Sequence, residues 1–124
     1  MTTNTKTAAA AAPDKALDLA RAAREALVDT KGHSVLLLDV RRMSSITDYV
    51  LIVSGSAAPH LKALAHAIEV RLKAEGSLCH RQSGKPDDGW IAMDYFDVVI
   101  HVMSREMREY YALEELWEAA PRLA

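Results

Sequence analysis

The sequence has little cysteine and no long hydrophobic run. Cys79 is the single cysteine among 124 residues, so no disulfide can form within the chain. This usage is typical of a reducing compartment, and we expect a cytoplasmic location. No apolar run approaches the roughly 20 residues that span a bilayer, and the N-terminus lacks the apolar core of a signal peptide. The sequence therefore predicts a protein without a membrane segment.

A strong charge of either sign is also lacking. The formal net charge is −2 at pH 7, which argues against a general, direct nucleic-acid binder. The charges are unevenly distributed, however. Residues 14–86 carry eleven basic and eight acidic side chains, whereas residues 87–118 carry two basic and nine acidic ones, together with six of the seven aromatic residues. This segment could form a binding surface for a basic partner. It could equally form an aromatic core surrounded by solvated acidic residues, and composition alone does not distinguish these two interpretations.

Length and composition predict one globular domain. Half of the residues are apolar and 26% are charged, which is ordinary for a chain that folds around one core. Residues 1–13 are alanine-rich and low in complexity, and we expect a disordered tail there. Residues 14–119 form the predicted domain, and residues 120–124 are expected to be a C-terminal tail.

Hydrophobic periodicity predicts three helices and five strands. The helices are expected at 14–30, 57–75 and 104–119, and the strands at 35–40, 48–53, 77–82, 90–95 and 97–103. The order α-β-β-α-β-β-β-α predicts the α+β type of α/β fold, with a mixed five-stranded sheet and flanking helices. The first two strands are expected to pair. The last two strands are expected to be joined by a tight turn at Tyr95, Phe96 and Asp97.

Individual residues predict where the first helix ends and where the second begins. Gly32 is expected to end the first helix in the left-handed conformation. Ser56 is expected to cap the second helix, with Pro59 in its first turn. The second helix carries an apolar stripe at helical spacing, formed by Leu61, Leu64, Ala65, Ile68 and Leu72.

One pattern is compatible with enzymatic chemistry. The Ser54-Gly55-Ser56 segment joins a predicted strand to a predicted helix, and a helix N-terminus can hold an anion. Four aspartates stand at predicted strand ends, where they could serve metal or acid–base chemistry or simply form turns: Asp39, Asp48, Asp94 and Asp97. A nucleotide- or metal-dependent transferase is therefore the alternative hypothesis. The spacing of the five histidines and Cys79 fits no metal site, and no cofactor is predicted.

Trp90 is the most informative single residue. It follows the turn-forming segment PDDG and opens a predicted strand. An exposed tryptophan beside acidic residues is typical of a binding anchor. The same residue could instead pack on the sheet as part of the core, and the sequence leaves both interpretations open.

Three motifs in order resemble those of one family. Residues 44–49 read SSITDY and are followed by SGS at 54–56, residues 88–103 read DGWIAMDYFDVVIHVM, and residues 108–117 fit R-x-x-Y-x-L-E-x-L-W. This set resembles the signatures of the ribosomal silencing factor (Iojap-like) family. The resemblance covers about residues 15–118.

The resemblance implies both a fold and a function. Family members look like nucleotidyltransferases in fold but are not known as enzymes. They bind a basic protein of the large ribosomal subunit, uL14, and they block joining of the subunits when nutrients are scarce. They are often homodimers off the ribosome. The Asp-x-Asp spacing of the transferases is missing here, because the first acid after Gly55-Ser56 is Glu69.

Carried over by position, the resemblance implies a set of partner-binding residues. Strand alternation puts Trp90 and Asp94 on one face and Met93 and Tyr95 on the other, so one flat face cannot present them all. We expect the turn end around Asp94–Asp97 to contribute most. Val98, Ile100 and Val102 are expected to be core. The candidates are Trp90, Met93, Asp94, Tyr95, Asp97, His101 and Met103.

Overall fold

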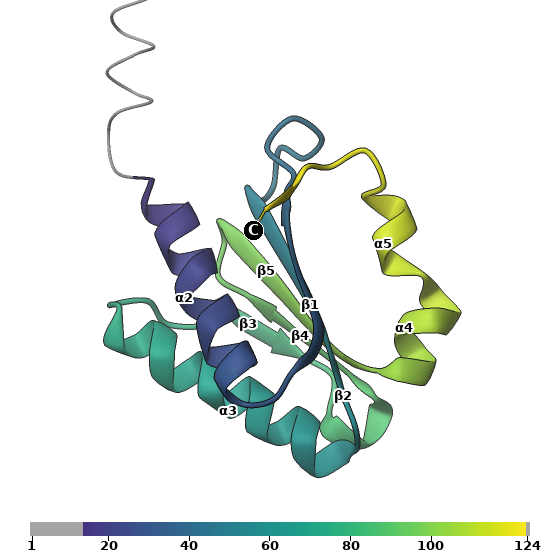
Figure 1. Cartoon of the computed structure of the whole chain (residues 1–124). Coiled ribbons are helices and arrows are strands. Elements are labelled where there is room, and N and C mark those ends of the chain that lie inside the picture. Colours follow the sequence, from purple (N-terminus) through teal and green to yellow (C-terminus); the bar gives the residue numbers. More distant parts are fainter. Residues whose placement is uncertain (1–13, 124) are drawn as a thin grey trace, which may run out of the picture.

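The computed structural model describes residues 14–123, which form a single mixed sheet with helices on both sides (Figure 1). Residues 1–13, predicted as a tail, lie outside the described residues. The helices are α2 (Lys15–Asp29), α3 (Ala58–Ala74), α4 (Arg105–Tyr111) and α5 (Leu113–Leu116), with a short 3-10 helix at Pro86–Asp88. The strands are β1 (His33–Asp39), β2 (Tyr49–Gly55), β3 (Arg81–Ser83), β4 (Trp90–Asp94), β5 (Val98–Ser104) and β6 (Arg122–Leu123).

The strand order in the sheet is β3-β4-β5-β2-β1-β6. Strands β1 and β2 pair antiparallel, as do β4 and β5, whereas β2 and β5 are parallel neighbours at the centre. The predicted fold class, a mixed sheet with flanking helices, is confirmed. The sheet has six strands rather than the predicted five, and the likeness to nucleotidyltransferases stays a prediction.

Helices α2 and α3 cover one face of the sheet (Figure 1). The apolar stripe predicted on α3 is buried there in full, and it joins alanines of α2 and aliphatic side chains of β2 and β5 in the larger core cluster. Val98, Ile100 and Val102 are completely buried in that cluster, as predicted. Removing this much apolar surface from water is the main stabilising contribution to the fold.

The opposite face is covered only in part, by α4, α5 and the chain that follows them (Figure 1). Leu38, Val50, Ile52 and Met103 form a smaller cluster there. Half-buried side chains close over it, and they include Trp90, Met107, Leu113 and Trp117. The second core is therefore smaller and more aromatic than the first.

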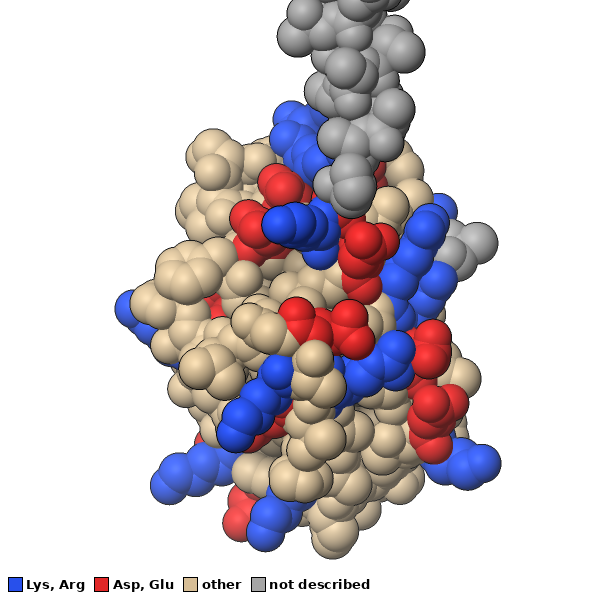
Figure 2. All heavy atoms as spheres, turned by 90° about the vertical axis from the view of Figure 1, so that its left-hand side faces the viewer, with Lys and Arg blue, Asp and Glu red and all other residues tan. Residues whose placement is uncertain are grey.

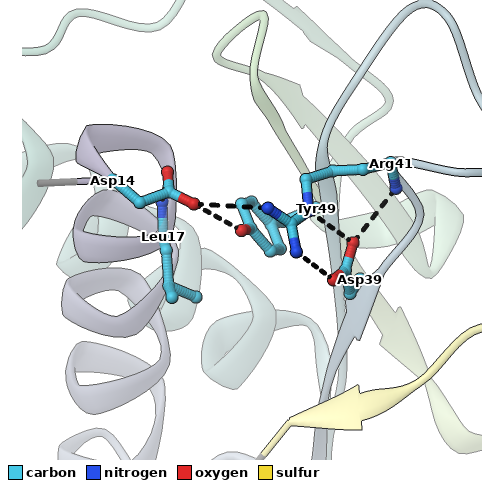
Figure 3. Close-up of polar contacts among 5 residues, drawn as sticks. All are labelled: Asp14, Leu17, Asp39, Arg41 and Tyr49. Atoms are coloured by element: carbon cyan, nitrogen blue, oxygen red, sulfur yellow. Dashed lines mark hydrogen bonds and ion pairs between the residues drawn. The ribbon is translucent and has the colours of Figure 1, made fainter. Parts of the chain in front are cut away.

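Polar contacts fasten the start of α2 to the sheet (Figure 3). Asp14 caps the helix by accepting from the Leu17 N–H at 3.0 Å, and it also accepts from the Tyr49 hydroxyl at 2.7 Å. Arg41 forms a two-pronged pair with Asp39 at 2.9 and 2.7 Å and lies over the Tyr49 ring. Burial favours the protonated form of Asp14, but these hydrogen bonds and Arg41 outweigh it and lower the Asp14 pKa. In the SSITDY motif, Tyr49 therefore has a structural role.

The single helix predicted at 104–119 is wrong. Helix α4 ends at Tyr111, because Ala112 takes a left-handed conformation with φ 46°, and α5 begins one residue later. The break turns the chain so that the buried Arg108 can donate to Glu114 at 2.7 Å. Arg108 also donates to the Ser34 carbonyl and the Ser54 hydroxyl. The contact with Glu114 depends on the bend, because residues six apart do not share a face of a continuous helix.

The predicted tail at 120–124 is also wrong for residues 120–123. Ala120 is buried, and Arg122–Leu123 pair with β1 as the edge strand β6. The Asp39 N–H donates to the Pro121 carbonyl at 2.9 Å, and Arg24 donates to the Leu123 carbonyl at 3.1 Å. The segment satisfies backbone groups that the edge of β1 would otherwise leave unpaired.

Two boundary predictions fail for local reasons. Lys31, with φ 65°, takes the left-handed position at the end of α2, whereas Gly32 is needed because a Cβ there would lie 2.6 Å from a Val53 methyl carbon. Ser56 does not cap α3. Ala57 is the N-cap, and the Ser56 N–H donates instead to Nδ1 of His60 at 3.0 Å.

Candidate functional site

The candidate site is the outer face of β4 and β5 together with the turn that joins them. Strand alternation divides β4 cleanly: Ile91 and Met93 face the core, whereas Trp90, Ala92 and Asp94 are half-buried on the other side. Opposite them on β5 stand Met103, His101 and Val99. Met103 is buried, so the β4–β5 surface consists of Trp90, Ala92, Asp94, Val99 and His101, the exposed turn residues Phe96 and Asp97, and the tyrosines of α4.

Trp90 is held at the start of β4 by its neighbours. Gly89, with φ 77°, ends the 3-10 helix directly before it. The indole Nε1 donates to Nδ1 of His101 at 3.1 Å, and the Tyr111 ring lies 4.9 Å away, centroid to centroid. Trp90 therefore packs on the smaller core and is also partly exposed, and its role as a binding anchor stays a prediction.

His101 lies in an apolar environment despite its position near the surface. Burial disfavours the charged ring and lowers the His101 pKa to about 4. The ring is thus neutral at physiological pH and can accept a hydrogen bond. The structure makes His101 a partner of Trp90, a role that the sequence motif did not reveal.

Two tyrosines of α4 extend the aromatic surface. The Tyr110 and Tyr111 rings meet edge to face at 4.9 Å, and Tyr110 is 79% exposed. Beside Trp90 is a shallow apolar pocket of about 370 Å³, lined by Ser83, Gly84, Asp88, Trp90, Ala92 and Met107. Rigid aromatic groups beside an apolar pocket are typical of protein-binding surfaces.

The turn between β4 and β5 exposes a residue that the sequence prediction missed. Phe96 is 59% exposed and has φ 66°, a left-handed conformation that is unusual for an aromatic residue. Its N–H donates to the Asp94 carboxylate at 2.8 Å, and its ring lies 4.1 Å from that of His80. The signal that could have found it is its central position in a three-residue turn, where side chains point outward.

The structure brings only some of the predicted contact residues to the surface. Trp90, Asp94 and His101 are half-buried, and Asp97 is exposed. Met93 and Met103 are fully buried, and Tyr95 is 4% exposed. These three side chains are removed from the candidate surface, because strand alternation and the cover of α4 direct them into the two cores.

Acidic groups gather at the turn end of the surface. The Asp97 carbonyl accepts from the N–H groups of both Asp48 and Tyr49, which places the start of β2 beside the turn. Burial and the nearby Asp97 charge raise the Asp48 pKa. Arg81 stands directly opposite Asp94 across the β3–β4 pair. The turn end therefore has more acidic than basic side chains.

The geometry argues against the transferase alternative. Asp39, Asp48, Asp94 and Asp97 all lie at the end of the sheet where β2 and β5 begin, whereas the Ser54-Gly55-Ser56 segment ends β2 about 20 Å away. Arg41 pairs with Asp39, and Ser54 accepts from Arg108. Within residues 14–123, no three His, Cys, Asp or Glu side chains are grouped so that they could hold a metal ion.

The side of the molecule formed by α2 and α3 has a different surface. Figure 2 shows blue and red side chains intermingled there, without a continuous field of one sign. The ion pairs of Arg71 with Glu25 and Glu75 belong to this side. The side shown in Figure 2 therefore carries no basic patch of the kind that binds nucleic acid.

None of the helices in the described part of the chain is long and apolar enough to cross a bilayer.

Fold and surface together define a small α+β domain with a mixed sheet and an aromatic, acidic surface on the sheet's partly covered face. The family model described as "Ribosomal silencing factor during starvation" matches residues 13–124. The chain belongs to this ribosomal silencing factor family, as its motifs indicated.

Individual relatives agree with this assignment. A ribosomal silencing factor RsfS from Chromobacterium violaceum is 34% identical over 100 residues, which cover 81% of this chain and 82% of the relative. A crystal structure of a protein from the same organism has a TM-score of 0.79 at 33% identity and covers 82% of this chain and 85% of that one. The mouse protein named "Mitochondrial assembly of ribosomal large subunit protein 1" is 39% identical over 88 residues, covering 68% of this chain and 39% of its own length.

Proposed function

We propose that this protein binds the large ribosomal subunit in the cytoplasm through the basic protein uL14, and that it silences translation by blocking subunit joining. The family match over nearly the whole chain supports a role at the ribosome. The mouse relative's name refers to the large subunit, which favours that subunit as the binding partner. The protein acts here as an obstacle and catalyses no reaction.

The observation that carries the proposal is the composition of the β4–β5 surface. It combines a half-exposed tryptophan, exposed tyrosines and an exposed phenylalanine with the carboxylates of Asp94 and Asp97. Aromatic anchors supply most of the free energy of protein binding, and acidic groups at the rim steer a cationic partner and exclude others. A basic ribosomal protein fits both properties.

The mechanism follows from size. A domain of 13.6 kDa that covers a joining surface of the large subunit occupies space that the small subunit needs. Silencing then requires only that the protein binds the large subunit at its joining surface, so the protein needs no cofactor. Release of the protein restores joining.

Sedimentation with purified large subunits tests the proposal. The wild-type protein should pellet with large subunits and reduce the formation of joined ribosomes. Trp90→Ala should weaken binding by at least about 2 kcal/mol, because it removes the central aromatic anchor. Ala92→Arg should weaken binding similarly by filling the adjacent pocket while leaving Trp90 in place.

A matched control distinguishes blocking of the β4–β5 surface from the effect of an added positive charge. Val70 is 57% exposed on α3, on the opposite side of the molecule. Val70→Arg introduces the same side chain as Ala92→Arg and should bind like the wild type. Equal binding by all four proteins, or wild-type protein that stays in the supernatant, would contradict the proposal.

A further inference from the structure

We propose that His101 is a positioning residue that holds the Trp90 indole in its binding orientation, an inference that rests on the proposed function. The two residues are diagonal neighbours on one face of the sheet: Trp90 stands opposite Met103, and His101 opposite Ala92. Such diagonal pairs lie within reach of aromatic side chains. Their rings are 5.8 Å apart, centroid to centroid.

The hydrogen bond between them has only one possible direction. An indole N–H is a donor and never an acceptor, so Nδ1 of His101 must be unprotonated where it receives Trp90 Nε1 at 3.1 Å. The apolar surroundings of His101 keep the ring neutral. The bond is therefore formed in the state of the ring that prevails at physiological pH.

The other neighbours of Trp90 do not fix its orientation in the same way. The Tyr111 ring lies 4.9 Å from the indole at a tilt of 51°, and Tyr111 is itself 51% exposed. Ring contacts of this kind depend weakly on direction, whereas a hydrogen bond selects one rotamer. His101 is thus the directional restraint on an aromatic group that otherwise stands at the rim of the smaller core.

Pre-orientation increases affinity by reducing the ordering cost of binding. A side chain that already holds its bound rotamer loses less freedom when a partner covers it. Trp90 lines the same apolar pocket as Ala92 and Met107. Loss of the restraint is expected to weaken binding about tenfold, although the Trp90 side chain itself is retained.

Two variants of His101 and one spectroscopic signal test the idea. His101→Leu removes the acceptor, whereas Asn in His101→Asn places an oxygen close to the position of Nδ1. The chain has two tryptophans, so its proton–nitrogen NMR spectrum contains two indole N–H signals, and that of Trp117 serves as an internal reference. The Trp90 signal should shift in His101→Leu and stay near its wild-type position in His101→Asn.

Binding to large subunits provides the second readout. His101→Leu should bind about tenfold more weakly, and His101→Asn within about threefold of the wild type. In a Trp90→Phe background, His101→Leu should have no further effect, because the group that it positions is gone. Three results would overturn the inference: wild-type affinity of His101→Leu for large subunits, an unshifted Trp90 indole signal in that variant, or an equal loss of affinity when His101→Leu is added to Trp90→Phe. If the wild type itself fails to bind, the proposed function is refuted, and the indole signal still decides whether His101 positions Trp90.

Discussion

The two faces of the central sheet differ in what covers them. Helices α2 and α3 close one face with aliphatic and alanine side chains, and its core residues are almost entirely buried. The other face has a small core under α4 and α5 and leaves Trp90, His101 and the tyrosines at its edge. The closed face holds the larger core, whereas the partly covered face leaves aromatic side chains exposed, and we propose that a partner binds there.

One strand shows how the division arises. Along β4, buried and half-buried residues alternate, so each face receives every second side chain. The closed face receives Ile91 and Met93, and the other receives Trp90, Ala92 and Asp94. A single strand thus supplies the core and the candidate surface at once, and a shift of one residue in register would exchange them.

The largest expected effect concerns the closed face. Leu64 on α3 is fully buried, and Leu64→Ala should destabilise the protein by about 3 kcal/mol, because it removes apolar contacts and leaves a cavity. Urea unfolding at pH 7 measures the change. Leu116→Ala on α5, where the side chain is 69% exposed, is the matched control and should cost less than about 0.5 kcal/mol. Similar costs for both would remove the distinction between the two faces.

The next effect concerns pH and the partly covered face. An unfolded histidine titrates near pH 6.5, whereas burial lowers the His101 pKa to about 4. Between these pH values His101 is protonated in the unfolded chain but not in the folded chain. The free energy of unfolding should therefore fall by about 2 kcal/mol as the pH is lowered from 7 to 5. Unfolding curves at several pH values should show this loss in the wild type. His101→Asn should have a smaller loss over the same range, and parallel profiles would show that His101 is not buried in its neutral form.

The smallest effect concerns the bend that brings α5 over the sheet. Ala112 has φ 46° and ψ 47°, where glycine avoids the steric cost of a Cβ. Ala112→Gly should therefore stabilise the protein by about 0.5 kcal/mol, seen as a slightly higher Tm. Ala22→Gly, in the interior of α2 on the closed side, should have the opposite sign. A lower Tm for Ala112→Gly would show that the bend does not depend on this residue's conformation.

Local patterns predicted much of the fold. The α3 stripe and the burial of Val98, Ile100 and Val102 follow from periodicity, and the structure confirms them. The first two strands also pair as expected, and the structure shows that they are antiparallel. The predictions that failed depended on contacts outside the regular spacing of one helix or strand. Arg108 meets Glu114 only because the last helix breaks between them, and residues 122–123 become a strand only beside β1.

The candidate site was predictable in part for the same reason. Alternation placed Trp90 and Asp94 on one face, but it gave no sign that α4 buries Met103 or that Tyr111 lies against Trp90. Phe96 was missed although the sequence placed it at the centre of the turn between β4 and β5, a position where side chains point outward.

The sequence by itself determined the family, the order of the main elements and the alternation of each strand, because these depend on motifs and on spacing along the chain. The tertiary structure alone decided which face stays partly open, which aromatic side chains meet there and that His101 accepts from Trp90. Those features require residues far apart in the sequence to come together, and spacing along the chain carries no information about such contacts.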